Sequence, residues 1–129
     1  MIIGTGIDIT ATDRIEASCN RLGERFLERI YTLAEQEEAM RRGRRRMDFL
    51  ASRFAAKEAV WKAINADRQA VISLNDIEIL PDQAGAPKVI LHGSALAAVN
   101  KKTDRNWQID ISLSDESGLA LAFVVFSAP

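Results

Sequence analysis

The stretch DFLASRFAAKEAVWKAINA, residues 48–66, contains neither glycine nor proline and is rich in alanine, lysine and other residues that suit a helix. It predicts a long helix that begins at the capping residue Asp48. We expect one stripe of this helix to face the core, formed by Phe49, Ala56, Val60, Ala63 and Ile64. The rest of the fold should therefore be arranged around this helix.

A strand is predicted at the start of the chain. Residues 2–9, IIGTGIDI, alternate with period two, which is typical of a strand. One face carries three isoleucines, and the other carries two glycines followed by a carboxylate: Ile3, Ile7 and Ile9 against Gly4, Gly6 and Asp8. A face as bare as the glycine face allows another backbone or a ligand to come close.

Between this strand and the long helix, helical spacing continues to about residue 42. Thr10 or Thr12 can cap the region, and breaks are expected near Gly23 and at residues 31–32. The stretch GRRRMD, residues 43–48, is predicted to be a connection between helices.

After the long helix, two strands are predicted at residues 76–80 and 87–91, because the turn residues PDQAGAP separate them. A short alanine-rich helix fits residues 94–101. The segments IDISLS, 109–114, and LALAFVVF, 119–126, flank turn residues and predict a closing hairpin. This order indicates the α+β class, with a largely antiparallel sheet and a long central helix.

The length and composition suit one soluble domain, which we expect to span residues 1–129. The chain has 17 basic and 18 acidic side chains, and its 47% hydrophobic content argues against a disordered chain. The longest apolar run, Leu119 to Phe126, is too short to cross a bilayer, and no signal peptide is recognisable. Cys19 has no partner for a disulfide. We therefore expect a cytoplasmic protein that contacts no membrane.

Ten of the twelve arginines lie between Arg14 and Arg53. Such a concentration favours an acidic or phosphorylated partner, although solvated helix faces give the same pattern. The run RRGRRR, residues 41–46, would also allow a small nucleic-acid-binding protein. That alternative is weak because no aromatic residues are interleaved with the run, so we expect no nucleic-acid partner.

Three polar residues suit chemistry on a phosphate. Glu58 and Lys62 are four residues apart, on one face of the predicted helix, although an exposed ion pair has the same spacing. Asp8 alone could equally be a loop or helix-capping acid. Together, Asp8 and Glu58 could share Mg²⁺, which completes its coordination with water and phosphate oxygens. Lys62 would then act as a point charge or proton donor toward a leaving phosphate, which suits a diphosphate-containing substrate.

Several motifs resemble those of the holo-acyl-carrier-protein synthases, the small trimeric branch of the 4′-phosphopantetheinyl transferases. They are GIDIT at 6–10, Arg14-Ile15, FLERIYTLAE at 26–35, RFAAKEAVWKA at 53–63, DIEI at 76–79 and the closing hairpin. The resemblance covers essentially the whole chain. Its most specific part is RFAAKEAVWKA at this distance from the N-terminal aspartate.

The resemblance implies an enzyme of fatty acid and lipid metabolism that transfers 4′-phosphopantetheine from coenzyme A to a serine of an apo acyl carrier protein and releases 3′,5′-ADP. Asp8 and Glu58 would bind Mg²⁺. Lys62 would contact the diphosphate and protonate the leaving 3′,5′-ADP. Glu58, or a metal-bound water that it orients, would be the general base.

The resemblance also implies where the two substrates bind. Coenzyme A would bind at a subunit interface of a homotrimer, with contacts from Arg45, Arg53, Phe54, Lys62, Ser114 and Asp115. The acidic carrier protein would dock on arginines that share one face if their helix is unbroken: Arg14, Arg21, Arg25 and Arg29.

Three positions depart from the family pattern. The loop INADRQA, residues 64–70, lacks the glycines of the family, Asp115 replaces a histidine, and Leu119 stands where a tyrosine is frequent. A carboxylate near substrate phosphates is repulsive. We therefore expect either that an arginine of RRGRRR neutralises Asp115 or that coenzyme A binds weakly. The alternative function is a weakened or non-catalytic homologue that binds the carrier protein.

Overall fold

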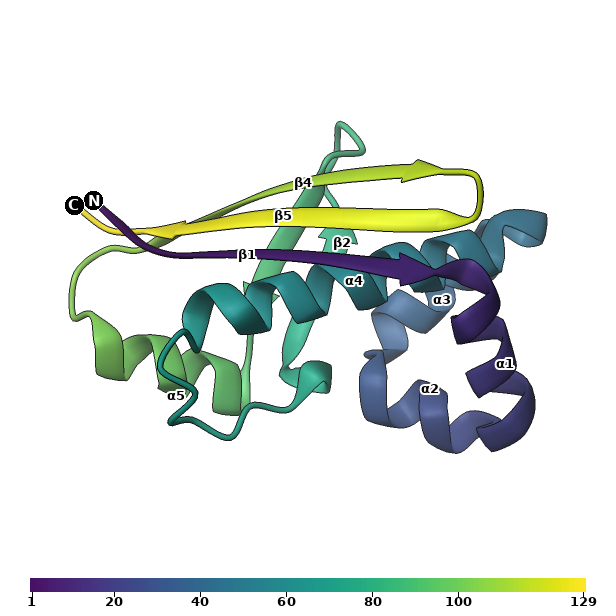
Figure 1. The fold of residues 1–129 in the computed structure, drawn as a ribbon, viewed down its shortest axis with the longest axis horizontal. Helices are drawn as coiled ribbons and strands as arrows, with labels where there is room; N and C mark the ends of the chain where they lie inside the picture. The colour runs from purple at the N-terminus through teal and green to yellow at the C-terminus, as the bar shows by residue number, and fades with distance from the viewer.

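The computed structural model describes all residues, 1–129, and places the predicted long helix at the centre of the fold. This helix, α4 (Arg46–Ile64), has twelve of its 19 residues buried, including every residue of the predicted core stripe. It lies between two antiparallel sheets (Figure 1). The predicted α+β class with a long central helix is confirmed, but the strands form two sheets, not one.

The larger sheet has three strands in the order β1 (Ile2–Ala11), β5 (Leu119–Ser127) and β4 (Gln108–Glu116). All pairs are antiparallel, and β1 and β5 both pack on α4. The bare face of β1 makes this packing possible. A Cβ atom at Gly4 would lie 2.1 Å from the carbonyl oxygen of Ala63, and one at Gly6 would lie 1.8 Å from that of Ala59. Another backbone therefore occupies the space that these glycines leave.

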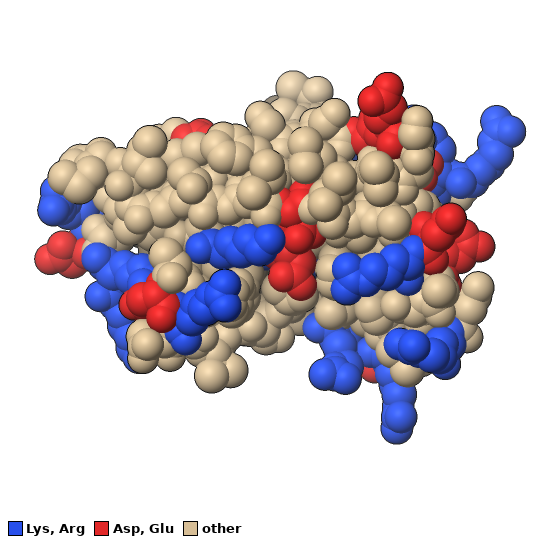
Figure 2. Space-filling model, in the orientation of Figure 1, with Lys and Arg blue, Asp and Glu red and all other residues tan.

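The opposite face of the larger sheet is apolar and points outward. It includes Ile7 and Ile9 of β1 and their register partners Phe123 and Leu121 of β5, and Leu119 lies beside them. Each of these five side chains is at least 39% exposed. In Figure 2 most of the surface over β1 and β5 is uncharged, apart from acidic and basic atoms near the middle of the view. We call this the outer sheet face.

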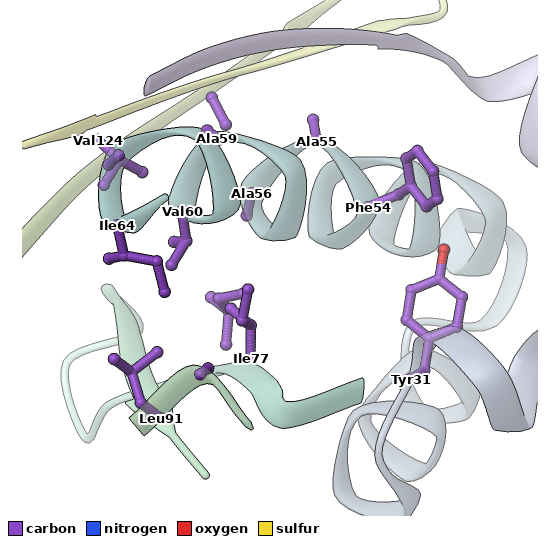
Figure 3. Packing of buried hydrophobic residues seen from close by; sticks show 14 of the residues in the cluster. Tyr31, Phe54, Ala55, Ala56, Ala59, Val60, Ile64, Ile77, Leu91 and Val124 are labelled. Carbon is purple, nitrogen blue, oxygen red and sulfur yellow. The ribbon is translucent and has the colours of Figure 1, made fainter. Parts of the chain in front are cut away.

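The smaller sheet closes the core on the other side of α4. It pairs β2 (Ile77–Pro81) with β3 (Pro87–Leu91), and α5 (Gly93–Lys102) follows it. In Figure 3, Ile77 and Leu91 lie opposite Val60 and Ile64 of α4. The predicted strands, turn and short helix are confirmed to within two residues.

The N-terminal helical region is broken as predicted, into α1 (Thr12–Leu22), α2 (Glu24–Ile30) and α3 (Leu33–Arg41). Two short 3₁₀ turns, η1 (Gly43–Arg45) and η2 (Leu74–Asp76), flank α4 in the sequence. The predicted cap of α1 is wrong, because its N-cap is Ala11 and has no side-chain hydrogen bond. None of the helices combines the length and apolarity needed to cross a membrane.

Candidate active site

Asp8 lies where the glycine face of β1 passes α4. The two residues before it on this face, Gly4 and Gly6, pack against the backbone of α4, so Asp8 is held beside the same helix. Its side chain is 19% exposed, and Thr10 Oγ1 donates a hydrogen bond of 3.0 Å to its Oδ2. Asp8 is therefore neither a helix cap nor a loop residue.

Glu58 and Lys62 of α4 lie next to Asp8. Lys62 Nζ donates to the carbonyl oxygen of Ile7 at 2.8 Å and lies 3.4 Å from Asp8 Oδ1. Partial burial raises the pKa of Glu58, and the negative charge of Asp8 raises it further, while Lys62 and Arg14 oppose the shift. The structure thus brings the three predicted residues together as two carboxylates and one ammonium group.

This donor set fits a hard divalent cation. Carboxylate oxygens are the protein ligands that Mg²⁺ prefers, and Mg²⁺ is usually held by one or two of them together with water and substrate phosphate. The chain has no group of three or more histidine, cysteine, aspartate or glutamate side chains placed to hold a metal ion. Asp8 and Glu58 would therefore be two protein ligands, and water and substrate would supply the others. A cation there would relieve the repulsion between the two carboxylates, which adds to the effect of burial in raising the pKa of Glu58.

A basic cleft lies near the N-terminal end of α4. Its volume is about 190 Å³, and its lining includes Arg42, Arg45, Phe49, Arg53 and Asp115. Arg53 is 7% exposed, its Nε donates to the carbonyl oxygen of Ile79 at 3.1 Å, and its guanidinium lies 4.3 Å from the centre of the Phe49 ring. Burial, with the nearby charge of Arg42, lowers the pKa of Arg53 to about 10, so it stays charged at neutral pH.

Asp115 has an arginine partner, which is the first of the two expected outcomes. Arg45 Nη2 lies 3.3 Å from Asp115 Oδ2, and Arg45 Nε lies 3.7 Å from Asp48 Oδ2. The charge of Arg45 offsets part of the repulsion that Asp115 would exert on a phosphate.

Two other predicted coenzyme A residues lie outside this cleft. Ser114 precedes Asp115 on β4, so the two side chains point to opposite sides of the sheet. Ser114 is on the same side as the outer sheet face. Phe54 is nearly buried, stacked on Phe26 at 6.5 Å, with the Arg14 guanidinium 5.2 Å from its ring centre. Within one chain, the predicted coenzyme A residues do not form one continuous surface.

The loop without glycines lies at the opposite end of α4 from Asp115. Asn65 closes it, since its side chain exchanges hydrogen bonds with the backbone of Ala70 at 2.9 and 3.1 Å. Arg68 has a φ of 57°, a left-handed conformation that usually favours glycine. The two main departures from the family pattern therefore act at different places in a protomer.

The four predicted docking arginines are exposed but do not share one straight helix face. The chain turns at Gly23, which has a φ of 60°, so Arg14 and Arg21 lie on α1 while Arg25 and Arg29 lie on α2. Arg25 and Arg29 line a groove of about 720 Å³ whose floor includes Leu22 and Phe26. The break expected near Gly23 therefore means that the condition of an unbroken helix is not met, although the arginines remain on the same end of the molecule.

Two further residues beside the site were not found from the sequence. Glu35 and Lys57 form an ion pair at 2.7 Å in which both side chains are fully buried. Lys57 directly precedes Glu58. A charged residue among the alanines of α4 is the sequence signal that could have indicated a buried ion pair. Its partner, 22 positions earlier on α3, could not be identified without the fold.

The chain matches known proteins over nearly its whole length. Residues 4–124 match the family model of the 4′-phosphopantetheinyl transferase superfamily. The chain is 42% identical to the holo-[acyl-carrier-protein] synthase of Paramagnetospirillum magneticum, and the match covers 99% of this chain and 98% of that protein.

Solved structures of two further holo-[acyl-carrier-protein] synthases have the same fold. That of Neisseria meningitidis has a TM-score of 0.81 at 34% identity and covers 98% of this chain and 99% of its own. That of Bacillus anthracis, in complex with CoA (3′,5′-ADP), has a TM-score of 0.76 at 33% identity and covers 100% of this chain and 99% of its own. The chain therefore belongs to the 4′-phosphopantetheinyl transferase superfamily and, within it, to the holo-[acyl-carrier-protein] synthases.

Proposed function

We propose that Asp8, Glu58 and Lys62 carry out the reaction of this holo-[acyl-carrier-protein] synthase. In that reaction, 4′-phosphopantetheine passes from coenzyme A to a serine hydroxyl of the apo acyl carrier protein, and 3′,5′-ADP leaves. The observation that carries the proposal is the convergence of two carboxylates and one ammonium group where β1 crosses α4. In Figure 2, acidic atoms flanked by basic side chains lie in the middle of the face that this crossing occupies.

In the proposed mechanism, each side chain has one task. Asp8 and Glu58 hold Mg²⁺, which when bound offsets the negative charge of the diphosphate. Glu58 accepts the proton of the serine Oγ as this oxygen forms its bond to the pantetheine-bearing phosphorus. The bond between the pantetheine-bearing phosphorus and the leaving oxygen of 3′,5′-ADP breaks, and Lys62 donates a proton to this oxygen. Because the Lys62 side chain is 46% exposed, its ammonium group can turn from Ile7 toward a bound diphosphate.

We also propose that coenzyme A binds between protomers of a homotrimer. Arg45 and Arg53 offer charge to its phosphates from the basic cleft, and Ser114 contributes from the outer sheet face of a neighbouring protomer. Two observations support this arrangement: the predicted residues do not meet within one chain, and a large apolar face is exposed. The acidic carrier protein would dock on the exposed arginines of α1 and α2, where complementary charge speeds encounter.

Mass spectrometry of an apo acyl carrier protein incubated with coenzyme A, Mg²⁺ and this chain tests the function. We expect the carrier to gain the mass of phosphopantetheine, and we expect a chelator to prevent it. Lys62→Met keeps the length of the side chain but removes the charge, so kcat should fall by about 100-fold or more, the usual scale for loss of a proton-transfer group. Lys88→Met, on an exposed part of β3, is the matched control. Full activity in Lys62→Met would contradict the assignment of Lys62.

A further inference from the structure

The fully buried ion pair between Glu35 and Lys57 connects four parts of the molecule. Lys57 Nζ lies 2.7 Å from Glu35 Oε1 and donates to the carbonyl oxygens of Leu74, at 3.1 Å, and Ile77. Glu35 Oε2 accepts from the backbone nitrogen of Ile79 at 2.8 Å. The pair therefore joins α4 and α3 to the backbone of η2 and β2 through directional contacts.

Stability alone is a poor explanation for such a pair. Removing two charges from water is costly, and well-packed apolar residues of similar volume are frequently as stable or more so. What an apolar pair cannot supply is direction, because dispersion contacts tolerate a small rotation that hydrogen bonds do not. Arg53, one turn before Lys57, adds a bond of the same kind to the carbonyl oxygen of Ile79.

The position of Lys57 in α4 is the second observation. Successive helix residues are separated by about 100° of rotation, so Lys57 and Ala59 lie on opposite sides of Glu58. Lys57 is bonded to the β2 side of the core. The carbonyl oxygen of Ala59 packs against Gly6 of β1 so closely that a Cβ on Gly6 would lie 1.8 Å from it. The rotation of α4 at Glu58 is therefore constrained from both sides.

We infer that the Glu35–Lys57 pair is a positioning device that fixes the rotation of α4 so that Glu58 faces Asp8. Neither Glu35 nor Lys57 contacts a substrate in this role, because both side chains are fully buried. The inference rests on the proposed roles of Asp8 and Glu58, and it extends them to residues that lie behind the active site.

The test replaces the pair by apolar side chains of similar volume in the double variant Glu35→Leu/Lys57→Met. Both kcat and the affinity for the metal should fall by about 10–100-fold, the range for groups that orient metal ligands, while KM for the carrier protein stays within about twofold. Metal affinity is measured without turnover, by titrating the protein with Mn²⁺ alone and following the electron paramagnetic resonance signal of the free ion. The melting temperature of each variant is recorded.

Val99→Ala is the matched control, because Val99 is fully buried in α5 and takes no part in the site. We expect it to lower the melting temperature but to leave kcat and Mn²⁺ binding unchanged. If the double variant does not fold, Glu35→Gln/Lys57→Met takes its place, since the amide keeps the shape and one acceptor and no buried charge is left unpaired. This variant is assayed at low temperature and should show the same losses to a smaller degree.

Two outcomes would overturn the inference, and each is distinct from failure of the proposed function. A folded pair variant with wild-type kcat and Mn²⁺ affinity would show that the pair only stabilises the core. If Val99→Ala, at the same melting temperature as the pair variant, lost as much kcat, the loss would be due to lower stability and not to the position of Glu58. If the wild-type protein itself transferred no phosphopantetheine, the proposed function would fail first.

Discussion

Gly6 shows how one missing side chain determines where the active site lies. Its φ is not unusual; what matters is that α4 passes so close that a methyl group would overlap the carbonyl oxygen of Ala59. The close approach brings β1 against the helix and places Asp8 beside Glu58 and Lys62. A residue that performs no chemistry thus controls the distance between two that do.

We therefore predict that Gly6→Ala destabilises the protein by about 1–3 kcal/mol, since β1 must move from α4 and a well-packed core resists such shifts. Activity should fall further than stability accounts for, because Asp8 moves with the strand. Urea unfolding and transfer assays would measure the two effects. Gly85→Ala, in the β2–β3 turn where a Cβ would meet no atom, is the control for an added methyl group, although its φ of 88° carries some strain. Unchanged stability of Gly6→Ala would disprove the close packing.

Asp115 and Arg45 form an exposed ion pair that contributes little to folding stability, and we propose that it affects coenzyme A binding. Side-chain exposures of 70% for Arg45 and 52% for Asp115 place it among surface ion pairs, which contribute about 0–1 kcal/mol. We predict that Asp115→His leaves stability nearly unchanged and tightens coenzyme A binding or raises turnover, because Arg45 is released toward the phosphates.

Calorimetric titration with coenzyme A would measure the effect of Asp115→His. The matched control is Asp104→His, an exposed aspartate that follows α5 and lies outside the basic cleft and the outer sheet face, for which no change is expected. Weaker binding in Asp115→His would mean that Asp115 holds Arg45 in its working position.

At the level of elements, α5 is held by a carboxylate from outside the helix. Its N-cap, His92, has no side-chain hydrogen bond, and Asp76 of η2 supplies the missing acceptor. Asp76 Oδ2 accepts from the backbone nitrogen of Ser94 at 2.9 Å and from Ser94 Oγ at 2.6 Å. The bond from the Ser94 hydroxyl has the largest effect and lowers the pKa of Asp76, and the backbone bond lowers it further. Partial burial opposes this shift.

We predict that Asp76→Ala lowers stability at pH 7 by about 1 kcal/mol, the usual worth of a helix-capping side chain. A carboxylate whose pKa is lower in the folded state stabilises fully above its unfolded pKa of about 3.9 and loses this effect as the pH falls through the folded pKa. The stability difference between wild type and Asp76→Ala should therefore shrink below about pH 4. Urea unfolding at fixed protein concentration, at pH 7 and at pH 3, measures it.

Ser94→Ala is the matched variant, since it keeps the backbone bond to Asp76 but removes the hydroxyl, which donates to Asp76 and accepts from the backbone nitrogen of Ser73. It should lose less stability than Asp76→Ala at pH 7. A difference between wild type and Asp76→Ala that stays constant down to pH 3 would contradict the capping role.

Local sequence signals predicted the elements well and their long-range partners poorly. The long helix, the breaks near Gly23 and at residues 31–32, and the hairpins follow from residue types that are neighbours in the chain. The buried pair between Glu35 and Lys57 joins two different helices and depends on how α3 packs against α4, whereas an arginine partner for Asp115 was expected as one of two outcomes. The alternation of residues in β1 did not show which of its two faces is buried. The glycine face is buried, because the backbone of α4 packs directly against Gly4 and Gly6.

For the whole molecule, the outer sheet face is the large apolar surface that the rest of the chain does not cover. β5 lies between β1 and β4, so Leu121 and Phe123 lie at the middle of this apolar face. Large apolar faces on soluble proteins mark interaction sites. Ser114 pairs with Leu121 across the strands, so an interface on this face would also bring Ser114 to a neighbouring protomer.

We predict that the wild-type protein is a trimer of its 14.3 kDa chain and that Phe123→Glu makes it monomeric, because an unpaired carboxylate buried in an apolar interface costs several kcal/mol, on the order of 3–5. Multi-angle light scattering at micromolar concentration measures the mass. Leu33→Glu, at a 75% exposed position on α3, is the matched control and should leave the mass unchanged. If coenzyme A binds between protomers, monomeric Phe123→Glu should also lose transfer activity although Asp8, Glu58 and Lys62 are intact. A wild-type monomer would refute the trimer, and a fully active Phe123→Glu monomer would place the complete coenzyme A site within one chain.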